Sequence, residues 1–212
     1  MKTDKELWRK AKYVWSTGSR ELSRLGEIID RGRFTACLRA IAECRGRIVT
    51  FGCGTSAAAA RKIAHSLSCI ERPAFFVSPA DAVHGALGSV QTGDVAILIS
   101  KGGATAEILA VVPALKSKEV FVIAVTENDS SPLAAAADLV LQVKVEREAD
   151  AFNMLATTST MAVVAVFDAI CIALIEYTGF TREQFAVIHP GGAVGRRLAT
   201  GLAGTEEADE SD

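Results

Sequence analysis

The chain has 212 residues, of which 50% are hydrophobic and 23% are charged, and its formal net charge is −2. This length and composition are typical of one globular domain, and a nearly neutral chain without a run of Lys or Arg excludes the dense basic face of a nucleic-acid-binding protein. The five cysteines form no C-x-x-C pair and follow no secretory leader. We therefore predict a reduced, cytoplasmic protein that binds no nucleic acid.

The first 45 residues are predicted to form helices that pack on the main domain. Apolar residues along 4–30 can share one helical stripe, and a second amphipathic helix is expected over 34–44. The main domain is expected over 46–202. The last ten residues, 203–212, are acidic and contain no large apolar residue, which predicts a disordered tail.

The main domain alternates strand-like and helix-like segments, which predicts right-handed crossovers and a parallel sheet of α/β class with helices on both sides. Such a sheet places its ligand site at the carboxyl ends of the strands. Helices are expected over 56–70, 104–118, 132–137 and 157–177. The five apolar runs that are typical of strands buried on both faces are Ile48–Phe51, Ala74–Val77, Val95–Ile99, Val120–Val125 and Leu139–Val145.

The longest apolar stretch, Met161–Ile175, is shorter than the ~20 residues of a membrane-spanning helix, and Asp168 interrupts it. It is therefore predicted to be a buried core helix or an interface helix, and no membrane partner is expected. This helix is more apolar than is needed to cover one face of a small sheet, so we predict that the chain forms a homo-oligomer.

The first strand leads through a glycine-rich turn, with Gly54, Thr55 and Ser56, into an Ala-rich helix. Glycines let backbone N–H groups approach an anion, and the helix N-terminus favours negative charge. The turn also matches the dinucleotide fingerprint G-x-G-x-x-A, which needs an acidic residue at the end of the next strand. Asp81 comes late and beyond a proline, so a dinucleotide is not favoured and no cofactor is expected.

A second turn of this kind follows the third strand, which we expect to pair with the first. Either turn alone could be an ordinary loop with a helix cap, but two side by side predict a phosphate site. A third hydroxyl cluster, Thr157–Thr160, includes Thr158 and begins the long helix. The candidate residues of the second turn are Ser100, Lys101, Gly102, Gly103 and Thr105.

Two histidines, His84 and His189, lie in glycine-rich turns, where a site residue is more common than a packing residue. His65 lies inside a predicted helix and is expected to be structural. The histidines and carboxylates show no ligand spacing, so no metal is expected. Glu107 lies in the first turn of a helix, where the helix dipole alone could favour it. Glu148 and Glu146 follow the last strand and would point to one side if the strand continued.

Motifs in the same order resemble the sugar isomerase (SIS) domain, and within it the arabinose 5-phosphate isomerases of the KpsF/GutQ type, over about residues 48–198. The resemblance implies a three-layer sandwich around a five-stranded parallel sheet of flavodoxin-like topology. It also implies a tetramer with sites at subunit contacts and a phosphorylated sugar as the ligand. The motifs are Pro73–Val77, His84–Gly88, Glu148–Ala149, Thr157–Thr160, Gly179–Thr181 and His189–Leu198.

By position, the resemblance implies site carboxylates at Glu107 and Glu148, site histidines at His84 and His189, and phosphate-binding hydroxyls at Ser56, Ser100 and Thr105. We expect Glu148, with a pKa raised by partial burial, to carry the proton between C1 and C2. His189 would open the ring and shuttle hydroxyl protons, with Glu107 and His84 orienting hydroxyl groups. His84 or His189 could reach the site of a neighbouring subunit.

The sequence also departs from the family pattern. Thr55 replaces a site lysine, Ala86 replaces an aspartate, and the usual pair of CBS modules is not expected after Leu198. Lys101 lies in the adjacent turn and either supplies the lost cation or points into water. An aldose-ketose isomerase is therefore predicted, and the alternative is a sugar-phosphate sensor that binds the ligand without converting it.

Overall fold

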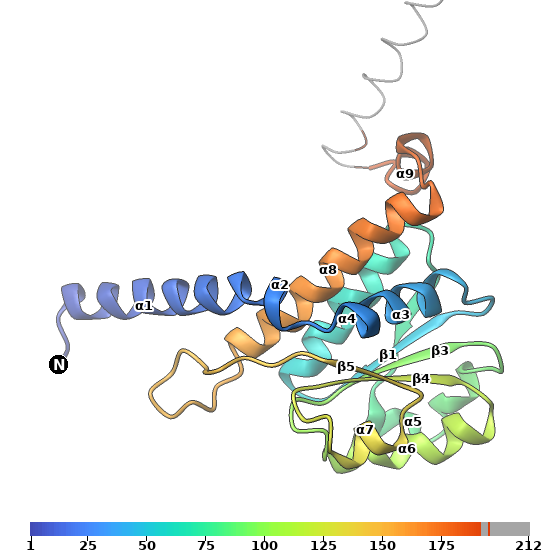
Figure 1. The fold of residues 1–212 in the computed structure, drawn as a ribbon, viewed down its shortest axis with the longest axis horizontal. Helices are drawn as coiled ribbons and strands as arrows, with labels where there is room; N and C mark the ends of the chain where they lie inside the picture. Colours follow the sequence, from blue (N-terminus) through green and yellow to red (C-terminus); the bar gives the residue numbers. More distant parts are fainter. Residues whose placement is uncertain (192–194, 196–212) are drawn as a thin grey trace, which may run out of the picture.

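The structure is a computed structural model that describes residues 1–191 and Gly195, so the predicted tail at 203–212 lies outside the described residues. Figure 1 shows a sheet between two layers of helices, with one long helix extending away from the domain. The elements in chain order are α1 (Asp4–Ser23), α2 (Leu25–Ile28), α3 (Arg31–Ala42), β1 (Ile48–Gly52), α4 (Thr55–Ser68), β2 (Ala74–Phe76), α5 (Pro79–Ala82), the 3₁₀ turn η1 (Ala86–Ser89), β3 (Val95–Ile99), α6 (Ala106–Ser117), β4 (Phe121–Thr126), α7 (Pro132–Ala136), β5 (Leu139–Gln142), α8 (Thr158–Thr178) and α9 (Arg182–Ile188).

The five strands form one parallel sheet in the order β2-β1-β3-β4-β5, which confirms the predicted α/β fold class. The expected pairing of the first and third strands is also confirmed, with Ile48 opposite Val95 and Gly52 opposite Ile99. The chain leaves β1 for β2 on one side and returns to β3 on the other. In this order the crevice between β1 and β3 is the topological switch point, where such sheets bind their ligands.

Helices cover both faces of the sheet because successive strand side chains point to opposite faces. Along β3, Ile97 and Ile99 pack into the cluster that includes residues of α3, α4 and α8. Ala96 and Leu98 point the other way, into the cluster that includes residues of α5 and α6. All five residues of β3 are buried, which explains the unbroken apolar run in its sequence.

Some element bounds differ from the expectation. The predicted strand Leu139–Val145 ends at Gln142, because its neighbour β4 ends at Thr126 and offers no further partner beyond the bond from the Val143 N–H to the Thr126 carbonyl. The predicted helix over 4–30 breaks before Asp30. The Asp30 side chain caps α3 by accepting a hydrogen bond from the Arg33 N–H. This cap requires an extended backbone at Asp30, so a helix cannot continue through it.

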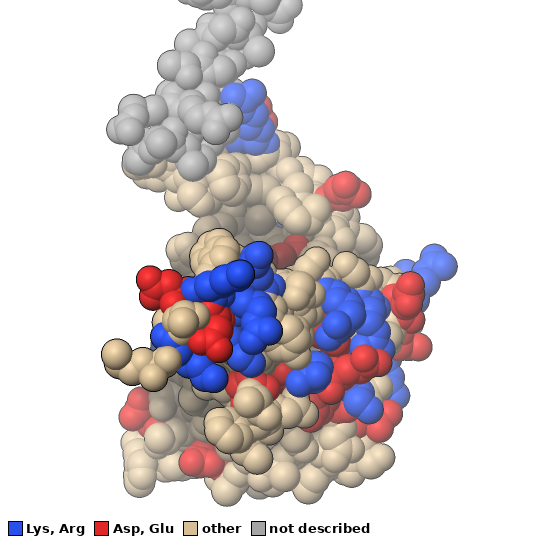
Figure 2. Space-filling model, turned by 90° about the vertical axis from the view of Figure 1, so that its left-hand side faces the viewer, with Lys and Arg blue, Asp and Glu red and all other residues tan. Residues whose placement is uncertain are grey.

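Only the last turns of the helix α1 are buried against the main body, while Tyr13 in its middle lies beside Arg147 of the loop after β5. Thr17, Gly18 and Glu21 are buried there, whereas Trp8 and Trp15 are more than half exposed. The rest of α1 extends away from the sheet (Figure 1). Figure 2 views the molecule from this side and shows a band of Lys and Arg side chains interspersed with Asp and Glu.

The helix α8 is 21 residues long and, by length and composition alone, apolar enough to cross a membrane. Its residues Phe167, Ile170 and Leu174 are buried in the core, and it packs against α1, α3 and α4. Asp168, which interrupts the apolar stretch, forms an ion pair with Lys62 of α4. These contacts are those of a core helix, in agreement with one of the two predicted interpretations.

Candidate functional site

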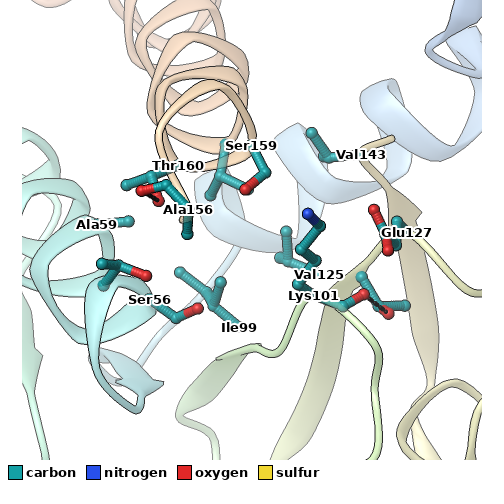
Figure 3. A pocket seen from close by; sticks show the side chains of 13 residues that line it. Ser56, Ala59, Ile99, Lys101, Val125, Glu127, Val143, Ala156, Ser159 and Thr160 are labelled. Atoms are coloured by element: carbon teal, nitrogen blue, oxygen red, sulfur yellow. Dashed lines mark hydrogen bonds between the residues drawn. The ribbon is translucent and has the colours of Figure 1, made fainter. Parts of the chain in front are cut away.

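A pocket lies at the carboxyl edge of the sheet, between the N-termini of α4 and α8. Figure 3 shows Ser56 and Thr160 on one side, Glu127 on the other, and Ser159 and Lys101 between them. The cavity measures about 70 Å³, which holds a few water molecules or a small polar group. Backbone N–H groups and helix dipoles favour an anion at such a place. The full list of lining residues is Thr55, Ser56, Ala59, Ile99, Lys101, Val125, Thr126, Glu127, Val143, Ala156, Ser159, Thr160 and Val163.

The turn after β1 requires glycine at two positions. A side chain at Gly52 would place its Cβ 2.6 Å from the carbonyl group of Ser56, and Gly54 has a φ of 55° with a ψ of −126°. The turn leads directly into α4, which begins without a side-chain cap. The N-terminus of α4 is therefore open toward the pocket, where Thr55 and Ser56 contribute their side chains.

The turn after β3 uses its polar groups internally. The Ser100 hydroxyl lies 2.8 Å from the Thr105 hydroxyl and accepts a hydrogen bond from the Gly103 N–H over 3.2 Å. Gly103 has a φ of 68°, and any Cβ there would collide with Ser131. Ser100, Gly102, Gly103 and Thr105 do not line the pocket. The hydrogen bonds and packing of these residues support the position of Lys101. Lys101 is the residue of this turn that enters the pocket.

Lys101 forms an ion pair with Glu148, because its Nζ donates to Oε1 over 2.7 Å. The alternative in which Lys101 points into water is therefore wrong. The backbone around Lys101 is fixed by Thr126 and Glu127, whose hydroxyl and N–H both donate to the Lys101 carbonyl over 2.9 Å. The site thus has a cation in the pocket although Thr55 occupies the position of the family lysine.

The Glu148 side chain is fully buried and caps α8. Its Oε2 accepts hydrogen bonds from the N–H groups of Thr157, Thr158 and Ser159 over 2.9, 2.8 and 3.3 Å, and from the Thr157 hydroxyl over 3.2 Å. Burial raises the pKa of Glu148, but the hydrogen bonds from Lys101, Ser159 and Thr157 outweigh it and lower the pKa from 4.5 to about 2.

Two expectations for Glu148 are wrong. Its pKa is lowered rather than raised, because burial comes with a cation and a helix N-terminus. It also does not share a face with Glu146, whose side chain is 66% exposed while that of Glu148 is buried. The alternation rule applies only within a strand, and β5 has already ended at Gln142.

Other predicted site residues lie outside the pocket lining. Glu107 is exposed in the first turn of α6. The pKa of Cys53, in the turn after β1, is raised mainly by burial of the thiol and further by the negative charge of Glu107. His84 is exposed in the turn after α5. The Thr158 side chain is fully buried, so its contribution is the N–H bond to Glu148, while its neighbours Ser159 and Thr160 line the pocket.

His189 lies at the opposite end of the domain. It follows α9, where its ring stacks on Phe185 with centroids 3.9 Å apart. Gln184 of α9 donates to Glu71 just beyond the end of α4, and α4 begins at the pocket. Its 14 residues span about 21 Å. One chain therefore does not bring His189 to the pocket that its own strands form (Figure 1).

Sequence reasoning missed Glu127, which lines the pocket directly after β4. The signal was available, because β4 pairs with β3 and its carboxyl end must lie beside Lys101. Among the residues that the structure describes, no group of three His, Cys, Asp or Glu side chains could hold a metal ion. The strand β2 ends at Phe76, so no acidic residue stands where a dinucleotide ribose would need one.

Known proteins share this fold. A protein from Listeria monocytogenes str. 4b F2365, assigned as a sugar-phosphate isomerase, is 48% identical, with a TM-score of 0.89 over 90% of this chain and 100% of its own. The structure of Escherichia coli CFT073 c3406 in complex with arabinose 5-phosphate is 34% identical, with a TM-score of 0.85 over 89% of this chain and 100% of its own.

Curated relatives are longer than this chain. The arabinose 5-phosphate isomerase KpsF of Escherichia coli O6:H1 (strain CFT073) is 40% identical over 191 residues, which make up 90% of this chain but 58% of KpsF. The chain thus spans less than two thirds of that relative. The SIS domain family matches residues 40–173, more than half of the chain. The resemblance predicted from the motifs is confirmed, and the chain belongs to the SIS domain family.

Proposed function

We propose that this chain is an aldose-ketose isomerase that acts on a phosphorylated sugar of the arabinose 5-phosphate kind. The observation that carries this proposal is the ion pair between Lys101, which lines the pocket, and Glu148, which lies buried behind the lining and caps α8. The uncapped N-terminus of α4 and the cation suit a phosphate, and the carboxylate suits a proton transfer. The identity to KpsF and to the protein solved with arabinose 5-phosphate supports the same ligand class.

The reaction requires a proton to move between neighbouring carbons. A carboxylate removes the proton from C2 of the aldose, the C–H electron pair forms the C1–C2 double bond, and the carbonyl oxygen takes up a proton to give an enediol. The C2 hydroxyl then loses its proton as the C2 carbonyl forms, and the carboxylic acid returns its proton to C1. Glu148 is the proposed proton carrier.

The remaining roles follow the same proposal. Thr55, Ser56 and Lys101 contact the phosphate or the enediolate, together with the backbone of Gly54. The second turn, with Ser100, Gly102, Gly103 and Thr105, holds Lys101 in place, and Thr158 holds Glu148. His189 opens the sugar ring, while Glu107 and His84 orient its hydroxyl groups. Because His189 lies about one helix length from the pocket of its own chain, it acts in the site of a neighbouring subunit.

Assembly into a homo-oligomer, and specifically a tetramer, is part of the proposal. The exposed side chains of Leu7, Trp8 and Trp15 on α1 offer an apolar face. A second exposed apolar group lies on the loop before α8, where the Asp150 carboxylate fixes the backbone by accepting three N–H bonds. Large exposed apolar patches mark interaction sites. We propose a cytoplasmic location, with a main domain at 46–202 and helices at 1–45 that also serve assembly.

A sugar-phosphate sensor is the second candidate, and one observation favours it. Both carboxylate oxygens of Glu148 are engaged, and its lowered pKa of about 2 makes it a weak base. A site of this kind could hold a phosphosugar without removing a proton from carbon.

Incubation with arabinose 5-phosphate in D₂O distinguishes the two candidates. An isomerase yields the 2-ketose and incorporates solvent deuterium at C1 or C2, which proton NMR detects. The Glu148→Gln variant should lose ~10²- to 10⁴-fold in turnover, whereas Glu146→Gln, an exposed carboxylate two residues earlier, serves as the matched control. A wild-type protein that binds the sugar in calorimetry but exchanges no deuterium would establish the sensor instead.

A further inference from the structure

We propose that Lys101 is a ligand-responsive residue that occupies Glu148 Oε1 in the free protein and moves onto the anionic group of a bound phosphosugar, leaving Oε1 free to act on carbon. The inference rests on the proposed function for the identity of the ligand, but the movement itself can be tested without turnover. It assigns Lys101 two alternative partners, the buried Glu148 and an anion in the pocket that Lys101 lines.

The two oxygens of Glu148 have different surroundings. Oε2 accepts four hydrogen bonds, from three N–H groups and one hydroxyl at the start of α8. Oε1 has Lys101 Nζ as its hydrogen-bond partner, and no other bond to Oε1 is present among the described residues. If Lys101 leaves, Oε2 still fixes the carboxylate at the helix N-terminus. Oε1 then has its lone pairs available, as a base requires.

Lys101 can make this movement because its side chain is partly exposed while its backbone is fixed. The side chain is 38% exposed, whereas that of Glu148 is buried. The Lys101 carbonyl accepts bonds from Thr126 and Glu127 on β4 and the residue that follows it. A lysine ammonium on a flexible four-carbon stem re-orients at little cost. The movement therefore involves the side chain alone.

An anion in the pocket competes for the ammonium. Ser56 at the start of α4, and Ser159 and Thr160 in the first turn of α8, line the same cavity as Lys101. A dianionic phosphate placed between these helices attracts Lys101 more strongly than one carboxylate does. Glu127 also lines this cavity, so an anion that entered without gaining the lysine would face two carboxylates.

The movement links ligand charge to base strength. Lys101 is one of the groups that lower the pKa of Glu148, so its departure raises that pKa toward the ordinary value and makes the carboxylate a stronger base. The hydrogen bonds from Thr157 and Ser159 remain, so the pKa of Glu148 stays partly lowered. A neutral sugar offers no anion to draw Lys101 away. The site should therefore activate Glu148 only for phosphorylated sugars.

The direct test follows both side chains by NMR at pH 7, with the Glu148 carboxyl carbon assigned by its loss in Glu148→Gln. Inorganic phosphate and arabinose 5-phosphate should each shift the Lys101 Nζ protons and the Glu148 carboxyl carbon together, while arabinose shifts neither. A phosphate that binds but leaves the Glu148 signal unchanged would overturn the proposal. So would an equal response to arabinose. This measurement uses the wild-type protein and needs no turnover.

A variant pair provides the second test. Lys101→Met should weaken the binding of inorganic phosphate and arabinose 5-phosphate by about 10- to 150-fold, the effect of one charge-assisted contact. Lys116→Met is the matched control, because Lys116 pairs with Asp138 outside the pocket. Circular dichroism verifies that both variants fold. Unchanged phosphate affinity in folded Lys101→Met would contradict the movement.

The acid limb of the kcat/KM pH profile, which reports groups of the free protein, separates this proposal from a structural role. In Lys101→Met the limb should move to higher pH than in the wild type, because the cation that lowers the pKa of Glu148 is gone. A limb at the wild-type pH would contradict the proposal. If no phosphosugar is converted by the wild type but phosphate still shifts both NMR signals, the proposed function fails while the movement of Lys101 stands.

Discussion

Replacing Glu148 by glutamine tests how strongly the charge at the start of α8 stabilises the fold. The pKa of this carboxyl is lowered from 4.5 to about 2 on folding, and each unit corresponds to ~1.36 kcal/mol. The ionised carboxylate therefore contributes ~3 kcal/mol to the free energy of unfolding at neutral pH. Glu148→Gln should lose this contribution, because an amide oxygen accepts hydrogen bonds but carries no charge to pair with Lys101.

The pH dependence follows from the direction of the shift. Because the folded-state pKa lies below the unfolded-state value, the contribution is fully present above pH 4.5 and is lost as the pH falls toward 2. The difference in unfolding free energy between wild type and Glu148→Gln should therefore fall from ~3 kcal/mol at pH 6 to ~1.4 kcal/mol at pH 3.

Urea denaturation followed by far-ultraviolet circular dichroism at pH 6, 4 and 3 measures this difference. Glu146→Gln is the control, since its side chain is 66% exposed and pairs with Arg24 at the surface. Such a pair contributes ~0–1 kcal/mol. A wild-type advantage over Glu148→Gln that stays constant from pH 6 to pH 3 would refute the assignment of the stability to the ionised carboxylate.

Three further predictions concern assembly and the turns. Light scattering at micromolar concentration should give a multiple of the 22.4 kDa chain mass, and Trp8→Ser with Trp15→Ser should reduce it; a monomeric wild type would contradict this. Mixed oligomers of inactive His189→Ala and Glu148→Gln chains should recover activity, and no recovery in verified mixtures would place His189 outside the neighbour's site. Gly103→Ala should cost ~1–3 kcal/mol of stability, because its Cβ meets Ser131. Gly102→Ala, in open space, should cost less, and equal losses would contradict the steric reason.

The sheet could be predicted from sequence because its strands are buried on both faces. All five residues of β1 and of β3 are buried, so their apolar runs stand out against the helices. The end of β5 could not be predicted, since Val143 and Val145 are as apolar as the strand itself and remain buried after it ends. The strand ends because its neighbour β4 ends, and the residues around Val143 carry no information about the length of β4.

The site could be predicted in part for the same reason. Glycine turns at strand ends are local features, so the positions of Ser56 and Lys101 at one sheet edge follow from the strand order. The pKa of Glu148 does not follow, because it depends on Lys101, 47 residues away, and on the first N–H groups of α8. A sequence motif identifies His189 as a candidate, but its distance from the pocket depends on the direction in which α8 runs.

The direction of α8 has a consequence for communication between sites. Its first turn caps the Glu148 carboxylate, and the segment beyond its last turn carries α9 and His189. The 21 residues in between form a rod of about 31 Å, buried along one side in the core. In an oligomer that places His189 in the neighbour's pocket, each rod joins two ligand sites. A tilt of α8 on ligand binding at one end would shift an acid-base group at the other, so saturation curves with a Hill coefficient different from one are expected.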